Sequence, residues 1–392
     1  MQDIFADLLV VELASVLAGP SVGMFFAELG ARVIKVEHHK NGGDVTRSWK
    51  LETEGEGDRS AYFSAVNWGK ESVGIDLRTE KGRNLVYGLV EKADVVIASY
   101  KPGDAEKLGM DAETLRARNP RLIYADLTAY GAEDQRVGFD AIIQAETGFT
   151  HMNGSPDGPP TKMPVALMDL LAAHQLKEGI LLALYGRLRS GEGAHIRTSL
   201  FQAGVASLAN QATNWLVAKK IPARIGSAHP NIVPYGTAWS TRDGREIVLA
   251  VGNDAQFRRL CACLGAPEIA EDPKFRENQG RVRHRAELEA WLAAQVRSHD
   301  RDALLEALHA AKVPVGAVRD MPDVFAQPPA EAMLLQGQSL TGVRSIALAG
   351  MEGLSLSEPP AMGVHTQAVL RDLLHLTEAE IADLQAVGAV FG

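Results

Sequence analysis

The first 37 residues contain the feature that most limits the fold. Residues 8–13 form a short apolar run typical of a buried strand, and residues 31–37 form a second one. A small-residue turn and a helix that ends at Gly30 lie between them. Pro20 falls in the first turn of this helix, where its missing N–H costs nothing. This order predicts a β-α-β unit, and therefore a parallel sheet with a helix start that favours anions.

The same alternation of strands and helices continues through residue 128. Further strands are expected at residues 73–77, 94–100 and 122–128, with a helix at about residues 80–91. Such a pattern predicts a doubly wound open sheet, in which ligands bind at the carboxyl ends of the strands. The first turn has only Gly19 and Gly23 and lacks the G-x-G-x-x-G fingerprint, which argues against a nicotinamide dinucleotide.

Composition narrows the functional classes. The chain has 392 residues and a formal net charge of −9, which argues against nucleic acid as a partner but allows a local basic pocket. The cysteines Cys261 and Cys263 suit a reducing compartment. The N-terminus carries Asp3, Asp7 and Glu12 without a basic segment, so it does not read as a signal peptide. No apolar run is long enough to span a membrane. We therefore expect a cytoplasmic protein.

One carboxylate stands at a conspicuous place in the middle of the chain. An apolar run at residues 164–168, expected to be extended, reaches Asp169, and residues 170–187 have the apolar spacing of a core-facing helix. Asp169 can be read as the N-cap of that helix. It can also be read as a nucleophilic carboxylate held beside a strand end. The local pattern does not decide between these two interpretations.

Several cations follow the predicted strands. Arg47, Lys70, Lys101 and Lys107 lie in segments that we expect to form loops at the carboxyl edge of the sheet. Each alone would be a solvated surface charge. Together at one sheet edge, they indicate an anionic ligand such as a nucleotide pyrophosphate.

A series of short motifs, spread over nearly the whole chain, resembles the class III (formyl-CoA transferase-like, CaiB/BaiF) CoA-transferases. The motifs are residues 17–20 (LAGP), 30–37 (GARVIKVE), 43–47 (GDVTR), 67–72 (NWGKES), 102–103 (PG), 138–145 (GFDAIIQA), 164–169 (PVALMD), 191–193 (GEG), 229–234 (HPNIVP), 272–275 (DPKF) and 362–366 (MGVHT). Each motif is weak alone, but all of them occur in the expected order.

The resemblance implies a chemical role for Asp169, which falls on the catalytic aspartate of that family. Its carboxylate would attack an acyl-CoA thioester and form an aspartyl-acyl anhydride and CoA thiolate. The thiolate would then form an aspartyl-CoA thioester and free the donor acid. An acceptor acid would complete the exchange through a second anhydride. An aspartate is ionised near neutral pH without a general base, so positioning and water exclusion would be the main contributions of the protein.

The resemblance also implies contacts with CoA, which would be a substrate and not a permanently bound cofactor. Val16 and Leu17 would lie against the adenine or the pantetheine. Ser99 and Tyr100 would line the ligand at a strand end, and Lys107 would approach the phosphates. No histidine lies at metal-ligand spacing, and no metal is expected.

Phe139 and Asp140 complete the predicted site. Phe139 stands where some members have a tyrosine, and Asp140 keeps an acidic group beside it. The acyl-CoA racemases of the same superfamily have a histidine at the position of Phe139, and phenylalanine cannot relay a proton. The residues predicted to bind CoA are therefore Val16, Leu17, Arg47, Lys70, Ser99, Tyr100, Lys107, Phe139 and Asp140.

The implied architecture is an α/β chain with a Rossmann-like large domain and a smaller α+β domain. The predicted boundaries are 1–200 for the first part of the large domain, 201–225 for a linker, 226–315 for the small domain and 316–392 for the return linker and the last part of the large domain. Family members form an interlocked homodimer, and we expect one here.

Finer elements are expected within these parts. We predict a helix at residues 200–217, small-domain strands at 236–241 and 247–251, helices near 255–264, 286–296 and 301–310, and a capping box at Thr377 and Glu380. Residues 313–318 are expected to return toward the large domain.

For the substrates, we expect succinyl-CoA or another dicarboxyl-CoA as donor and a carboxylic acid as acceptor. CoA transfer between the two carboxyl groups of one acid is a variant. An acyl-CoA racemase, or a CoA-binding scaffold without activity, is the alternative from another functional class. The intact Asp169 argues against the scaffold.

Overall fold

The computed structural model describes residues 3–351 and 355–392, and the chain divides into two compact units. The first unit comprises Met1–Thr147, Met163–Ala212 and Pro328–Gly392, and the second comprises Gly148–Lys162 and Thr213–Gln327. Each unit has its own sheet and its own apolar core.

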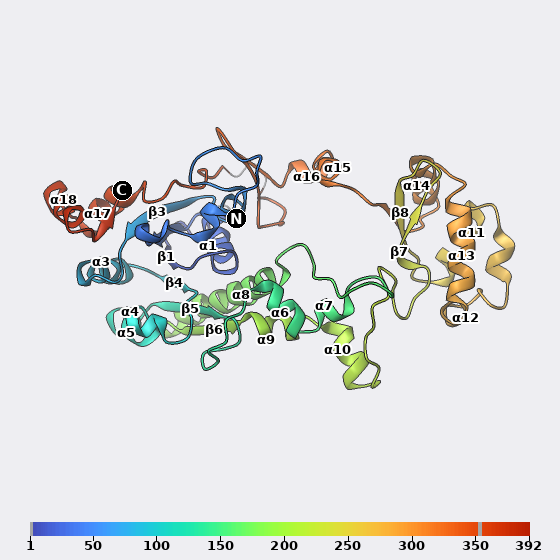
Figure 1. The fold of residues 1–392 in the computed structure, drawn as a ribbon, viewed down its shortest axis with the longest axis horizontal. Coiled ribbons are helices and arrows are strands. Elements are labelled where there is room, and N and C mark those ends of the chain that lie inside the picture. The colour runs from blue at the N-terminus through green and yellow to red at the C-terminus, as the bar shows by residue number, and fades with distance from the viewer. Residues whose placement is uncertain (1–2, 352–354) are drawn as a thin grey trace. The chain divides into compact units, whose positions relative to one another are not determined.

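A seven-stranded sheet forms the centre of the first unit (Figure 1). Its spatial order is β12-β3-β2-β1-β4-β5-β6, and all neighbours are parallel except β12, which pairs antiparallel with β3. The strands are β1 (Leu9–Leu13), β2 (Arg32–Glu37), β3 (Lys70–Ile75), β4 (Val95–Ala98), β5 (Ile123–Thr128), β6 (His195–Ser199) and β12 (Val390–Phe391). The predicted parallel sheet is confirmed.

The strand order reverses between β1 and β4. Both strands are parallel, and Val10 of β1 lies opposite Val33 of β2 on one side and Val95 of β4 on the other. In a doubly wound sheet such a reversal opens a crevice at the carboxyl ends of the two strands, because their connections leave in opposite directions. The segments that follow β1 and β4 are therefore the natural ligand-binding edge.

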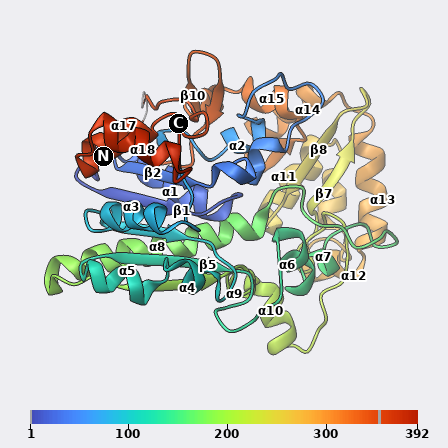
Figure 2. The same ribbon diagram turned by 60° about the vertical axis from the view of Figure 1, so that its left-hand side comes forward.

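Helices cover both faces of this sheet. One face packs against α1 and α8, and the other packs against α3, α5 and α17 (Figures 1 and 2). The helices of this unit are α1 (Ala18–Glu28), α2 (Ala61–Ser64), α3 (Glu80–Val90), α4 (Asp104–Leu108), α5 (Ala112–Arg118), α6 (Asp140–Glu146), α8 (Leu167–Ser190), α9 (Leu200–Ala206), α16 (Pro328–Glu331), α17 (Thr366–Leu374) and α18 (Glu378–Ala386). A short hairpin, β10 (Leu334–Gln336) and β11 (Thr341–Val343), completes the unit. The capping box of α18 is present as predicted.

The start of α8 corrects both readings of Asp169. The helix begins at Leu167 with Ala166 as its N-cap residue, so Asp169 lies within the first turn and is not the cap. The residues before it form no strand. Their backbone is instead bonded to the side chain of Gln144, which accepts from the Met163 N–H at 2.8 Å. The carboxylate is thus held at a helix start and not at a strand end.

A group of charged residues is buried beneath the turn between β1 and α1. We call Glu12, Lys35, Glu37, Asp44, Arg47 and Lys70 the buried charge cluster; all six are at most 4% exposed. Glu12 binds the ammonium groups of Lys35 at 3.0 Å and Lys70 at 2.8 Å. Three carboxylates thus balance three cations.

The partners in this cluster are closely coupled. Burial, with the neighbouring Lys35 ammonium as a smaller cause, lowers the pKa of Lys70 to about 8, although the Glu12 carboxylate opposes this shift. Burial also acts against the charge on Lys35, but Glu12 and Asp44 outweigh it and raise the pKa of Lys35. The cluster is electrostatically satisfied only as a whole.

Two of the predicted surface cations belong to this cluster, which corrects their expected position. Lys70 is the first residue of β3 and not part of a loop, and its ammonium group binds Glu12, Asn67 and the Pro20 carbonyl. Arg47 binds Glu37 through two donors, at 2.8 and 2.6 Å, and also the Pro360 carbonyl. Neither cation is presented at the ligand edge, because each is held by buried acceptors.

The second unit is built on a three-stranded antiparallel sheet. Its order is β7 (Tyr235–Ser240), β8 (Glu246–Ala250) and β9 (Val315–Ala317). The prediction that residues 313–318 return to the large domain is wrong, since β9 pairs with β8. The helices that lie within the second unit are α7 (Phe149–Met152), α11 (Asp254–Cys263), α12 (Asn278–Arg283), α13 (Arg285–Val296), α14 (Arg301–Ala310) and α15 (Met321–Phe325).

The helix predicted at residues 200–217 is two helices, α9 and α10 (Ala209–Leu216). The break follows Ala206, where the Ser207 hydroxyl donates back to the Ala203 carbonyl at 2.8 Å. A hydroxyl bonded to the preceding turn competes with the helical ladder.

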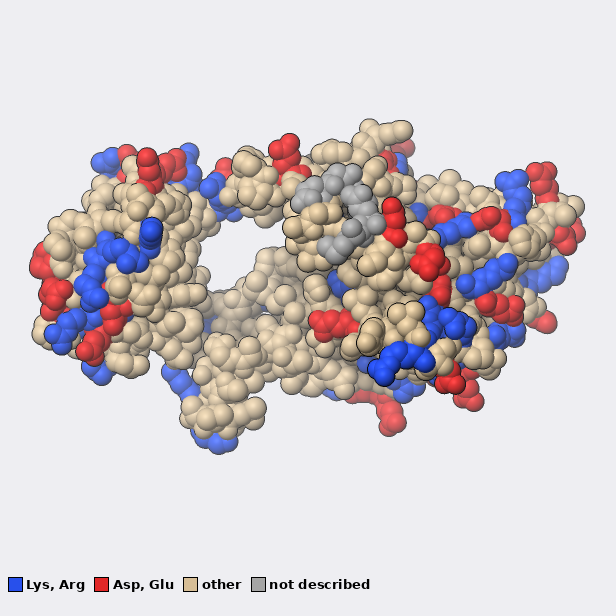
Figure 3. Space-filling model, turned by 180° about the vertical axis from the view of Figure 1, so that it is seen from behind, with Lys and Arg blue, Asp and Glu red and all other residues tan. Residues whose placement is uncertain are grey.

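The surface shows no segregation of charge on the face drawn in Figure 3, where acidic and basic side chains are interspersed. Among the described residues, none of the helices has the length and apolar character needed to cross a bilayer.

The buried charge cluster yields a stability prediction. We expect Glu12→Gln to lower the free energy of unfolding by about 3–5 kcal/mol, because two buried ammonium groups lose their shared counter-charge. Chemical denaturation of the variant and the wild type measures this. Asp104→Asn removes an exposed partner of Lys107 and is the control, with an expected change below about 1 kcal/mol. Equal, small effects of both substitutions would contradict a coupled cluster.

Candidate active site

Asp169 is the best candidate for a reactive group in the first unit. It lies in the first turn of α8, a helix of 24 residues, and is only 7% exposed. Among the residues that the structure describes, its carboxylate has neither a hydrogen-bond partner nor an ion-pair partner. A nearly buried carboxylate without a partner is uncommon, because burial of an unpaired charge costs free energy.

The residues around Asp169 come from α6 and from the segment before α8. Asp140, the first residue of α6, accepts from the Met168 N–H at 2.7 Å and from the Gln144 amide at 2.7 Å. Met168 directly precedes Asp169. The first turn of α8 is thereby tied to α6 one residue before the candidate nucleophile.

The environment of Asp169 changes its ionisation. Burial, with the nearby Asp140 carboxylate as the smaller cause, raises the pKa of Asp169 to about 7. At neutral pH, about half of the molecules carry the carboxylate form. A carboxylate with a raised pKa is a stronger nucleophile than a solvated one, and a shift of this size is typical of functional sites.

Tyr62 on α2 is a neighbour of this site that sequence reasoning missed. Burial raises the pKa of Tyr62, and the leading charge that contributes is that of Asp169, followed by that of Asp140. Its ring packs edge-on against Trp49, with 5.1 Å between the ring centroids. The phenol and the carboxylate come together only through the tertiary fold, so no local pattern could have identified Tyr62.

The predicted residues Val16, Leu17 and Ser99 lie together at the reversal point of the sheet. The Ser15 N–H donates to the Ser99 hydroxyl at 3.3 Å, which joins the turn after β1 to the end of β4. Val16 has a φ of 73°, and its N–H donates to the Asp44 carboxylate at 3.2 Å. A left-handed conformation is unfavourable for a β-branched residue, so the buried charge cluster holds this turn in place.

The other predicted CoA contacts are more scattered. Lys107 is exposed on α4 and paired with Asp104 at 2.8 Å. Phe139 is exposed, and Asp140 beside it is buried and fully engaged with Met168 and Gln144. Burial raises the pKa of the Tyr100 phenol, which lines a separate cavity. The structure thus does not bring these four residues into one site.

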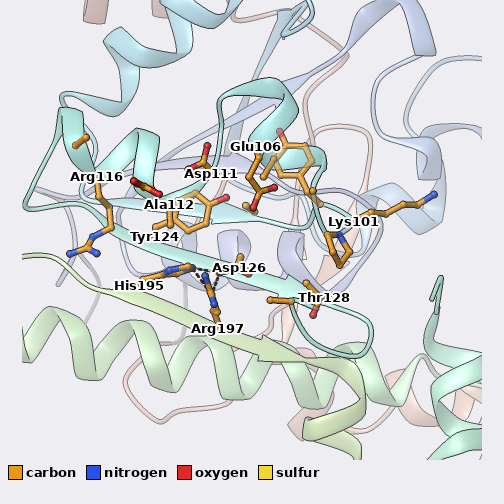
Figure 4. Close-up of a pocket in the computed structure, with 18 of the residues that line it drawn as sticks. Lys101, Glu106, Asp111, Ala112, Arg116, Tyr124, Asp126, Thr128, His195 and Arg197 are labelled. Atoms are coloured by element: carbon orange, nitrogen blue, oxygen red, sulfur yellow. Dashed lines mark hydrogen bonds and ion pairs between the residues drawn. The ribbon is translucent and has the colours of Figure 1, made fainter. Parts of the chain in front are cut away.

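That cavity lies on the sheet face opposite α8 (Figure 4). Its volume is about 670 Å³, and side chains from β5, β6, α4 and α5 line it. His195 binds Asp126 at 2.5 Å at its floor, and Tyr124 packs edge-on against His195. Asp169 is not among the lining residues, so the cavity is distinct from the candidate active site.

A cationic site that sequence reasoning missed lies at the carboxyl ends of β2 and β3. His38, Lys40 and Arg78 surround the Asp76 carboxylate, at 3.0, 3.0 and 3.1 Å. The Arg78 guanidinium, together with Lys40, holds the pKa of Asp76 well below its usual range. Lys40 and Arg78 remain about half exposed, so they can also contact a ligand. The two cations follow adjacent strands, and this placement was the signal that could have found them.

The comparisons with known proteins identify the class that this fold and site define. Residues 5–366 match CoA-transferase family III. The chain belongs to this family, and it is a CoA-transferase of class III, which confirms the resemblance noted in the sequence.

Individual relatives cover the chain almost completely. A succinate–glutarate CoA-transferase of Agrobacterium fabrum is 40% identical over 379 residues, which are 93% of this chain and 94% of that protein. A succinyl-CoA:glutarate CoA-transferase of Mus musculus is 34% identical, over 97% of this chain and 89% of that protein. The crystal structure of a CaiB/BaiF family protein from Brucella suis is 41% identical and has a TM-score of 0.83, over 95% of this chain and all of that one.

The raised pKa of Asp169 predicts a dependence of stability on pH. The folded protein binds this proton up to about pH 7, whereas the unfolded chain releases it near pH 4, so wild-type stability falls as the pH rises between these values. Asp169→Asn removes the titration. We expect the variant to gain about 1.4 kcal/mol over the wild type for each pH unit in this interval.

Thermal and chemical denaturation between pH 4 and pH 9 measure this difference. Asp157→Asn, at an exposed position, is the control and should follow the wild type at every pH. A constant difference between Asp169→Asn and the wild type would contradict the buried, unpaired carboxylate.

Proposed function

We propose that this protein transfers CoA from succinyl-CoA or another dicarboxyl-CoA to a carboxylic acid acceptor, with Asp169 as the covalent relay. The observation that carries this proposal is the nearly buried Asp169 carboxylate, without a partner in the described chain, at the start of α8. The relatives support the substrate class, since one at 40% identity and one at 34% identity are named for succinate and glutarate. Transfer within one dicarboxylic acid would use the same chemistry.

The reaction proceeds by exchange of acyl partners at one carboxylate. An oxygen of Asp169 attacks the thioester carbon of the donor, which gives an aspartyl-acyl anhydride and releases CoA thiolate. The thiolate attacks the aspartyl carbonyl and displaces the donor acid, which leaves an aspartyl-CoA thioester. The acceptor carboxylate attacks that thioester, and the released thiolate then takes the acceptor acyl group. The Asp169 carboxylate is regenerated, and no step requires an external proton donor.

The surroundings of Asp169 favour the attack by its carboxylate and protect the anhydrides. Burial keeps water from the anhydrides, which hydrolyse readily, and removes the solvation that would weaken the attacking carboxylate. The ties between Met168, Asp140 and Gln144 fix the approach of the nucleophile. The N-terminus of α8 favours the negative charge that develops beside Asp169 during each attack.

We infer the position of CoA from the segments at the carboxyl edge of the sheet. We place its thioester end near Asp169 and its pantetheine along the turn formed by Val16, Leu17 and Ser99. The phosphates are assigned to the exposed cations Lys40 and Arg78, which follow β2 and β3 at the same edge. Helix starts and cations at a sheet edge are the usual partners of such phosphates.

The α8 helix supports the proposal of a homodimer, interlocked as in the family. Leu182, Tyr185 and Leu188 are 73%, 64% and 86% exposed and lie on one side of the helix. Apolar side chains in such a row are typical of an interface. The molecular mass in solution tests this proposal.

A location in the cytoplasm remains a prediction.

The covalent relay is tested by intact-protein mass spectrometry after mixing with succinyl-CoA. We expect a CoA or succinyl adduct on the wild type, and hydroxylamine should convert it to a hydroxamate on the peptide that holds Asp169. Asp169→Ala should form neither, and Asp157→Ala, at an exposed site, should behave like the wild type. Absence of any adduct with a panel of acyl-CoAs, together with α-proton exchange in deuterated water, would replace the transferase proposal with a racemase.

The phosphate assignment is tested by steady-state kinetics. Lys40→Ala and Arg78→Ala should each raise KM for the acyl-CoA about tenfold, equivalent to about 1.4 kcal/mol for a charge-assisted contact, with little change in kcat. The effect should shrink at high salt. Lys92→Ala, an exposed lysine after α3, is the matched control. An unchanged KM in both variants would exclude this site for the phosphates.

A further inference from the structure

We propose that Asp140 and Gln144 form a positioning pair that holds Asp169 in place through the Met168 backbone, and that the charge of Asp140 raises the pH at which Asp169 becomes nucleophilic. This inference rests on the proposed function of Asp169. It assigns Asp140 a role other than the CoA contact that the sequence suggested.

Both carboxylate oxygens of Asp140 already accept hydrogen bonds from the protein. One carboxylate oxygen accepts from the Met168 N–H and the other from the Gln144 amide, both at 2.7 Å. The side chain is buried, with 9% exposure. A buried carboxylate bonded in this way acts on Asp169 through the Met168 backbone and through its charge.

Gln144 completes the pair from the next turn of α6. It is fully buried, and its carbonyl accepts from the Met163 N–H at 2.8 Å. Its amide lies 3.4 Å from the carbonyls of Met163 and Val165. The single side chain therefore fixes both Asp140 and the extended segment that leads into α8.

The elements packed against α8 bring few charged groups toward Asp169. Asp140 of α6 and the phenol of Tyr62 on α2 are the titratable groups that couple to it. Helix α9 carries no charged residue, and the one charge of α1 is Glu28 at its far end, where it faces Lys177. On β5 and β6, Asp126, His195 and Arg197 line the cavity on the opposite face of the sheet.

Asp140 affects Asp169 in two ways, through its charge and through its hydrogen bond to Met168, and substitutions can distinguish them. The charge of Asp140 disfavours a second negative charge on Asp169, because two nearby carboxylates oppose each other's ionisation. The acceptor oxygen of Asp140 holds the Met168 amide, and with it the direction of the nucleophile. Asp140→Asn keeps an acceptor oxygen for Met168 but removes the charge and the acceptor for the Gln144 amide, whereas Asp140→Ala also removes the acceptor for Met168.

The experiment compares these variants by the rate of adduct formation with succinyl-CoA from pH 5 to pH 9. In Asp140→Asn the acidic limb of the rate–pH profile should shift by about one unit toward lower pH. KM for succinyl-CoA should stay within about twofold of the wild type. In Asp140→Ala the rate at the plateau should also fall, by about a hundredfold. Glu146→Gln, an exposed position on the same helix, removes the same charge and should leave the profile unchanged.

A second measurement does not require the CoA-transfer reaction to take place. The pH dependence of the stability gained on Asp169→Asn reports the ionisation of Asp169 directly, and in the Asp140→Asn background its upper limit should move down by the same pH shift. If the profile and this stability difference are both unmoved by Asp140→Asn, the inference is overturned. If the wild type forms no adduct while the stability difference still moves, the proposed function fails and the electrostatic part of the inference stands.

Discussion

The ion pairs of Glu12 with Lys35 and Lys70 hold together the part of the molecule on which the site depends. They lie beneath the turn between β1 and α1 and connect three strands, β1, β2 and β3. Through Asp44 the same cluster holds Val16 in its left-handed conformation. Through Glu37 and Ser72 it also reaches the Gly363 amide, near the C-terminal end. Removing one member leaves a buried charge without a partner, so the edge of the sheet is stable only as a unit.

Asp169 represents the opposite use of a buried charge. The cluster neutralises its carboxylates with cations, whereas Asp169 lies beside another carboxylate and has no cation partner among the described residues. This arrangement costs stability in the ionised form and produces a carboxylate that reacts without a general base. The buried charge cluster stabilises the fold around Asp169, whereas the ionised Asp169 destabilises it. Asp169 depends on that stability, because an unpaired group stays in position only when its surroundings are rigid.

Local patterns predicted the β-α-β start, the parallel sheet and the helix that carries Asp169, since these features are encoded in neighbouring residues. They failed where long-range partners decide the outcome. Lys70 looks like a loop cation until Glu12, distant in sequence, meets it in the core. The extended run before Asp169 looks like a strand until Gln144 takes its backbone donor. Tyr62 and the cations around Asp76 likewise gather only through the tertiary fold.

The account rests on Asp169 as the covalent relay, and the transfer of labelled oxygen tests this most directly. In the proposed sequence the acceptor acid leaves one of its carboxylate oxygens on the aspartate when CoA thiolate takes its acyl group. After turnover of succinyl-CoA with an ¹⁸O-labelled dicarboxylate, mass spectrometry of the digested protein should find the heavy oxygen on the peptide that holds Asp169. Turnover that leaves this peptide unlabelled would contradict the account, because CoA would then reach the acceptor without passing through Asp169.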